Sequence, residues 1–189
     1  MDINENKNTP ICFPKNKPHK IPNGTGESRE LREIPFKTIF TGQHQELYDD
    51  VKKMVPEFDY YLDIMKDNQS LNEIISGIST GFNEILKKES PNLFMVQGDT
   101  SSATISAIIA FYKKIPVGHV EAGLRTYNKY SPFPEEMNRC LISKIADIHL
   151  CPTTIAVNNL RKEGITQKVY LVGNTVVDAF NLISNVPNS

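Results

Sequence analysis

The sequence lacks long apolar runs, an excess of charge of one sign and a cysteine framework. Its longest mainly apolar stretch, residues 103–112, is too short to cross a bilayer. The formal net charge of −1 gives no electrostatic case for nucleic acid or an anionic membrane as a partner. The three cysteines have no CxxC spacing, and their odd number favours reduced thiols. The first ten residues have no apolar core typical of a secretory signal, so we expect a cytoplasmic protein.

Several catalytic patterns are missing as well. No glycine-rich dinucleotide fingerprint follows any predicted strand, and no Ser-His-Asp or Cys-His arrangement stands out. His119 and Glu121 lie two residues apart at the end of one predicted strand, but nothing at suitable spacing supplies a third metal ligand. We therefore expect no cofactor and no metal, and a His119 that is buried and hydrogen-bonded.

From Phe36 onwards, apolar strand-like segments alternate with amphipathic helical ones. The predicted strands are 36–40, 93–96, 115–120, 147–151 and 168–172, while 60–64 fits a short strand or an extended loop. The predicted helices are 45–54, 70–88, 101–114, 134–145, 153–163 and a last one from 176. This alternation is typical of a Rossmann-like α/β fold, a parallel sheet with helices on both faces.

The predicted helix 70–88 has the clearest start. Ser70 and Glu73 have the spacing of a capping box, in which each side chain satisfies a free backbone N–H of the other. Gly77 and Gly81, four residues apart, predict a close approach of this helix to the sheet. By contrast, residues 1–27 are polar and rich in Asn, Lys, Pro and Gly, so we expect a disordered leader there.

Acidic residues follow the ends of neighbouring predicted strands. Asp99 and Glu121 do so directly, and Glu135 and Glu136 open the helix that the connection from Glu121 reaches. In open α/β sheets, ligands bind beyond the carboxyl ends of the strands. Crowded carboxyl groups raise one another's pKa, so that one can hold a proton while another accepts one. The sequence therefore indicates proton transfer at carbon.

Each of these acids also has a purely structural interpretation. Asp99 could cap the following helix, and Glu135 and Glu136 could complement the dipole of theirs. Glu121 lies between apolar neighbours, which predicts burial with a partner such as Arg125. A structural and a catalytic role can hold at once.

Five motifs in this order resemble those of the non-hydrolysing UDP-N-acetylglucosamine 2-epimerases of bacteria and archaea. They are TGQH at 41–44, QGDT at 97–100, GHVEAGLRT at 118–126, SPFPEEMNR at 131–139 and GNTVVD at 173–178. The resemblance implies one half of a GT-B-type enzyme with two Rossmann-like domains. Such enzymes interconvert UDP-GlcNAc and UDP-ManNAc through a glycal without a cofactor, as homodimers, in nucleotide-sugar and surface polysaccharide biosynthesis.

The resemblance also implies roles for individual residues. Asp99, Glu121 and Glu135 match the catalytic acids of the family, without a division into base and acid. The positions that match substrate or effector binding are Gln43, His44, Arg125, Glu136 and Asn174.

The chain departs from the family at both ends. Members begin with a strand and a Gly-Thr-Arg-Pro-Glu loop, where this chain has residues 1–27, and it ends at Ser189 without a second domain. We thus expect an incomplete N-terminal domain over 28–189, with an empty central sheet position that calls for a partner strand, oligomerisation or poor solubility. The alternative to an epimerase is a truncated or degenerate paralogue without turnover, acting at most in binding or subunit interaction.

Overall fold

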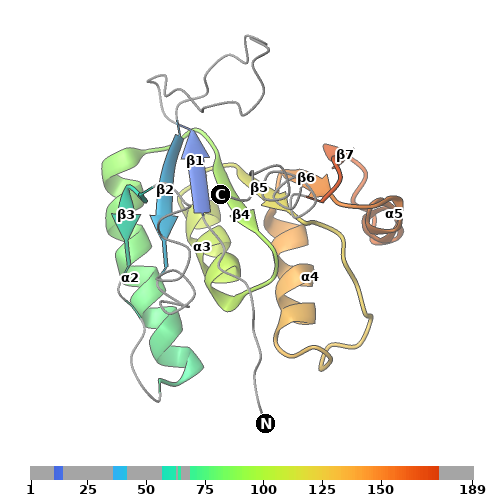
Figure 1. Ribbon diagram of the computed structural model, residues 1–189, viewed down its shortest axis with the longest axis horizontal. Coiled ribbons are helices and arrows are strands. Elements are labelled where there is room, and N and C mark those ends of the chain that lie inside the picture. Colours follow the sequence, from blue (N-terminus) through green and yellow to red (C-terminus); the bar gives the residue numbers. More distant parts are fainter. Residues whose placement is uncertain (1–10, 15–35, 42–56, 63, 65–68, 175–189) are drawn as a thin grey trace, which may run out of the picture.

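A computed structural model describes residues 11–14, 36–41, 57–62, 64 and 69–174. Within these residues, seven strands form one sheet in the order β3-β2-β1-β4-β5-β6-β7 (Figure 1). The strands are β1 Ile11–Pro14, β2 Phe36–Phe40, β3 Tyr60–Tyr61, β4 Phe94–Gln97, β5 Val117–Val120, β6 Ile148–Cys151 and β7 Val169–Leu171. The helices are α2 Leu71–Glu89, α3 Ser101–Tyr112, α4 Glu135–Ile145 and α5 Thr154–Lys162.

The α/β fold class is confirmed. Strands β4 to β7 are parallel to one another, and β2 is parallel to β3. Helices α2, α3 and α4 lie side by side along the sheet (Figure 1). Every predicted element inside the described residues is present to within two residues at either end, and 60–64 holds a short strand. The helices predicted for 45–54 and from 176 lie outside the described residues.

Helix α2 packs its apolar stripe on the sheet. Ile78, Phe82 and Leu86 are buried, and the Phe82 ring meets that of Phe94 edge to face at 5.7 Å. The capping box is confirmed, because Ser70 Oγ accepts from Glu73 N while Glu73 Oε2 accepts from Ser70 N at 2.8 Å. The glycines of this helix do approach a neighbour, which is the segment that leaves β3. A Cβ on Gly81 would lie 2.5 Å from Leu62 Cδ2.

Strand β1 corrects the expectation for the N-terminal segment. Ile11–Pro14 lies between β2 and β4, antiparallel to both, at the central position that we expected to be empty. The prediction of a disordered leader is therefore wrong for these four residues, and the rest of 1–27 lies outside the described residues. Local composition misses such a strand because its pairing partners are distant in sequence and the apolar segment is only four residues long.

The loop after β5 passes so close to α5 that it needs a glycine. Gly123 has a φ of +87°, and a Cβ there would lie 2.3 Å from the backbone oxygen of Ala156. The oxygen of Gly123 itself accepts a hydrogen bond from Asn159 Nδ2 at 3.0 Å. This contact fixes the start of the loop that carries Arg125.

Gly123→Ala is expected to lower the free energy of unfolding more than Gly164→Ala. Both glycines have a positive φ, +87° and +80°, so each substitution introduces about 1–2 kcal/mol of backbone strain. Only at Gly123 does the new Cβ meet a neighbour, which adds about 1–3 kcal/mol. Urea unfolding of both variants measures the difference, and equal losses would contradict the close approach.

Candidate functional site

The carboxyl ends of β4 and β5 bring the described acids together. Gln97 and Val120, the last residues of these two strands, are paired in register. Asp99 follows β4 after Gly98, and Glu121 follows β5 directly. The edge location predicted for these two acids is therefore confirmed.

Asp99 is tied to α4 rather than used as a helix cap. Its side chain is 5% exposed, and Oδ2 accepts from Arg139 Nε at 2.8 Å. Its backbone oxygen accepts from Asn138 Nδ2 at 2.8 Å. The cap of α3 is Thr100, whose Oγ1 accepts from the N–H of Ala103. The capping interpretation of Asp99 is thus wrong, and its carboxylate forms an ion pair at the sheet edge.

Glu121 adopts the left-handed backbone conformation, with a φ of 63°. This conformation costs about 1–2 kcal/mol for a residue with a Cβ, and such strain is concentrated at functional sites. Glu121 Oε1 accepts a hydrogen bond from Gln97 Nε2 at 2.9 Å, so the last residue of β4 orients the acid that follows β5.

Arg125 does not provide the partner that the sequence suggested for Glu121. Its guanidinium donates to Glu163 at 2.6 and 2.9 Å and to Ser143 Oγ at 2.9 Å, with the side chain fully buried. Burial lowers the pKa of Arg125, but the Glu163 carboxylate outweighs this effect and the pKa is raised overall. Because the chain turns at Glu121, Arg125 faces α4 and the end of α5 instead.

Glu136 holds the loop that leads from β5 to α4. Its two carboxylate oxygens accept from the backbone N–H of Tyr127 at 2.8 Å and of Thr126 at 3.0 Å, and Arg139 Nη1 lies 3.2 Å away. Burial raises the pKa of Glu136, but these hydrogen bonds lower the pKa by more than burial raises it, so the net shift is downward. Glu136 therefore acts as a buried anion that orders the loop.

Glu135 differs from its neighbour in its surroundings. Its Oε2 is buried and has no hydrogen-bond partner among the described residues. Both acids lie in the first turn of α4, where the helix dipole favours negative charge. Since a buried oxygen without a partner is unfavourable, Glu135 has an acceptor position available for a ligand.

The structure describes some of the remaining predicted residues and not others. Gln43 and His44 lie outside the described residues, and Asn174 is exposed beyond the end of β7. His119 is fully buried with Nε2 2.8 Å from the oxygen of Gly98, as predicted. Among the described residues, no group of three or more acidic, histidine or cysteine side chains could hold a metal ion, and no helix could span a membrane.

The residues that position these acids were not predicted from the sequence. Arg139, Asn138 and Gln97 hold Asp99 and Glu121, yet none was singled out. A signal existed for Arg139, because it follows Glu135 and Glu136 by four and three residues and so shares their helix face.

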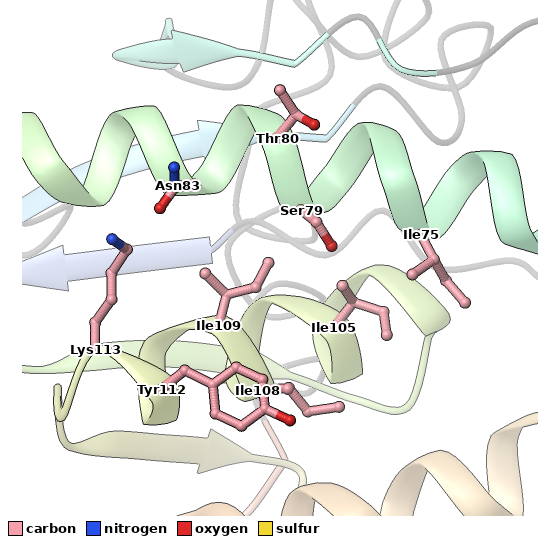
Figure 2. A pocket seen from close by; sticks show the side chains of 9 residues that line it. All are labelled: Ile75, Ser79, Thr80, Asn83, Ile105, Ile108, Ile109, Tyr112 and Lys113. Carbon is pink, nitrogen blue, oxygen red and sulfur yellow. The ribbon is translucent and has the colours of Figure 1, made fainter.

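A groove on the described surface is separate from these acids. It is an open, mainly apolar groove of about 660 Å³ between α2 and α3, lined by Ile75, Ile105, Ile109 and Tyr112 among others (Figure 2). None of the acids at the carboxyl edge lines it. The site is therefore the acidic edge of the sheet and not this groove.

Fold and site together define a Rossmann-like α/β domain with an acid-lined carboxyl edge. The sequence model of the UDP-N-acetylglucosamine 2-epimerase family matches residues 27–188, and the chain belongs to this family. The UDP-N-acetylglucosamine 2-epimerase of Neisseria meningitidis is 46% identical over 155 residues, 81% of this chain and 42% of that protein.

Solved structures agree with this assignment. The N. meningitidis UDP-GlcNAc 2-epimerase bound to UDP-GlcNAc superposes with a TM-score of 0.71, covering 76% of this chain and 40% of that one. The Methanocaldococcus jannaschii enzyme in complex with UDP-GlcNAc and UDP gives 0.69 at 35% identity, over 79% of this chain and 43% of that one. The chain thus spans about two fifths of the length of these relatives.

Arg139→Met is expected to destabilise the fold by about 3–5 kcal/mol, since it leaves the buried Asp99 carboxylate without its cation. The matched control is Arg161→Met on the exposed surface of α5, for which we expect a change within about 0.5 kcal/mol. Guanidinium unfolding of both variants at pH 7 measures the two values. A loss below about 1 kcal/mol for Arg139→Met would show that the ion pair does not support the site.

His119 should make stability depend on pH. Burial lowers its pKa from 6.5 to about 4, so only the unfolded chain takes up a proton between these values. The contribution of His119 to the free energy of unfolding is fully present above pH 6.5. It should fall by about 2 kcal/mol between pH 7 and pH 5. His119→Gln cannot titrate there, so its loss over the same interval should be about 2 kcal/mol smaller. Identical pH dependence in urea unfolding of the two proteins would refute this contribution.

Proposed function

We propose that the chain is the acid–base half of a UDP-N-acetylglucosamine 2-epimerase, an isomerase that interconverts UDP-GlcNAc and UDP-ManNAc. The observation that carries the proposal is the buried Oε2 of Glu135, which has no hydrogen-bond partner within the described part of the chain and lies one helical turn before the Arg139 that binds Asp99. Family membership and the substrates bound to solved relatives support the choice of nucleotide sugar.

The proposed reaction is a pair of proton transfers at C2 of the sugar. A base removes the C2 proton while the bond from C1 to the UDP oxygen breaks, leaving a glycal and free UDP. An acid returns a proton to the opposite face of C2, and the UDP oxygen forms the C1 bond again. Asp99, Glu121 and Glu135 are the groups proposed to move these protons. Proton and UDP are both recovered, so the reaction needs no redox cofactor.

Substrate and effector binding is proposed for Gln43, His44, Arg125, Glu136 and Asn174. The contacts of Arg125 and Glu136 favour a role in positioning other residues of the site rather than direct contact with the substrate. Arg125 is buried against Glu163, and Glu136 orders the loop after β5, so both would shape the edge of the site. We also propose a cytoplasmic homodimer that supplies surface polysaccharide biosynthesis.

The second candidate function is a subunit or paralogue without turnover. The chain spans about two fifths of the length of the matched relatives, so turnover is tested on the described domain joined to the rest of a relative.

Grafting residues 36–174 into the N. meningitidis relative, in place of the aligned segment, tests the proposal. The graft should convert UDP-GlcNAc into UDP-ManNAc, followed by NMR of the two sugars. Glu121→Gln and Glu135→Gln should each lower kcat by about 100-fold or more, because each removes a proton-transfer group. Glu84→Gln on the exposed face of α2 is the matched control and should leave the rate unchanged.

Two outcomes would contradict the proposal. Full activity in the Glu121→Gln and Glu135→Gln grafts would show that these acids are not catalytic. An inactive graft that is folded and binds UDP would favour the paralogue without turnover. The ungrafted chain serves as a further control, and conversion by this chain alone would show that the rest of the relative is not needed for turnover.

A further inference from the structure

Helix α5 docks on the chain segment that follows Glu121. The helix lies beside β6 and β7, at one end of the described sheet (Figure 1). Its residues Ala156, Asn159 and Glu163 are three and four positions apart, so they share one face of the helix. All three approach or bond the loop 122–127. Because α5 carries none of the acids proposed for chemistry, it can act on them only through this loop.

Asn159 holds two points of the loop with one side chain. Its Nδ2 donates to the oxygen of Gly123 at 3.0 Å, and its Oδ1 accepts from the Tyr127 hydroxyl at 2.8 Å. Because a backbone oxygen can only accept, the amide must turn its nitrogen to Gly123, which leaves its oxygen for the hydroxyl. The residue is 7% exposed. Asn159 thus lies behind the loop, shielded from solvent, and ties residues 123–127 together.

The loop depends on such contacts because its backbone is strained. Glu121, Gly123 and Tyr127 have positive φ values of 63°, 87° and 61°. A residue with a Cβ keeps this conformation only where its surroundings impose it. On the side before Glu121 the sheet does so, since the N–H of Gly98 donates to the oxygen of Val120 at 3.0 Å.

Two hydrogen bonds restrain the chain just after Glu121. The N–H of Ala122 donates to the oxygen of Leu150 in β6 at 3.0 Å, and the oxygen of Gly123 accepts from Asn159. Of these two, the second alone depends on a side chain, so a substitution can remove it. Without it, the backbone after Glu121 can relax towards an extended conformation. This relaxation turns the Glu121 carboxylate away from its hydrogen bond at the end of β4.

We propose that Asn159 is a positioning residue for the proton transfer at Glu121. Through the oxygen of Gly123 it keeps the left-handed turn closed, and so keeps the Glu121 carboxylate in place, without touching the substrate itself. This role rests on the proposed enzymatic function. It concerns the reacting group and not the hold on the nucleotide sugar, so its loss should lower kcat and leave KM nearly unchanged.

Asn159→Leu, made in the graft of residues 36–174, removes both hydrogen bonds and keeps a side chain of similar shape. It should lower kcat by about 10–100-fold and change KM by less than about threefold, because a misplaced reacting group costs rate. The matched control is Asn158→Leu, on the exposed side of the same helix, which should change neither value. Tyr127→Phe removes only the bond to Oδ1 and should keep about a third of kcat or more, since the contact with Gly123 remains.

A double substitution shows whether Asn159 acts through Glu121. Glu121→Gln alone should lower kcat by about 100-fold or more, and adding Asn159→Leu should lower it further by less than about threefold, because residues that act as one unit are not additive. Deuterium exchange at C2 in D2O follows these slow reactions. Calorimetric titration with UDP gives the folded fraction, by which each kcat is divided. If Asn159→Leu does not fold, Asn159→Asp replaces it, since it keeps the acceptor for Tyr127 and loses the N–H for Gly123.

Four results would overturn this role in a graft that is active and is impaired by Glu121→Gln. They are a kcat of the Asn159 variant within about threefold of the parent graft, a loss that appears in KM alone, a loss of about 10-fold or more that recurs in the Glu121→Gln background, and an equal loss in Tyr127→Phe. The last would place the effect at the far end of the loop. An inactive parent graft, or full activity of Glu121→Gln, would instead contradict the proposed function, and the role of Asn159 with it.

Discussion

The Arg139 guanidinium joins the three segments from which the candidate site is built. It projects from α4 and pairs with Asp99 at the end of β4 and with Glu136 on its own helix. Glu136 in turn accepts from the backbone of Thr126 and Tyr127, in the loop after β5. One largely buried cation thus sets the positions of a strand end, a helix start and the loop between them, and it offsets two carboxylates that would otherwise repel.

Of the three acids proposed for chemistry, Asp99 pairs directly with this cation, whereas Glu121 and Glu135 have different surroundings. Glu121 is held by the neutral amide of Gln97 in a strained backbone conformation, and Glu135 keeps a buried oxygen for a ligand. Differences in surroundings of this kind are how similar carboxyl groups take separate roles in one site. We propose that this arrangement supplies the proton-transfer groups of the site.

Much of this could be predicted from the sequence where the signals are local. The capping box at Ser70, the continuous apolar run of β4 and the acids after β4 and β5 all lie where periodicity and strand-end geometry placed them. The partners could not be predicted in the same way. Arg125 is near Glu121 in sequence, but the left-handed turn at Glu121 directs it to Glu163, and Asp99 is bound by a residue 40 positions away. Strand β1 was missed for a related reason, because only the distant strands β2 and β4 give its four residues a sheet to join.

We propose that the carboxyl edge organised by Arg139 moves protons at C2 of a UDP-sugar. Deuterium incorporation, measured by NMR on the grafted enzyme incubated with UDP-GlcNAc in D2O, tests this proposal. Because a proton that leaves C2 is replaced from solvent, the account predicts that the UDP-ManNAc formed carries deuterium at C2, and that Glu121→Gln suppresses this exchange together with epimerisation. UDP-ManNAc that forms at the normal rate but keeps its original C2 hydrogen would contradict the account.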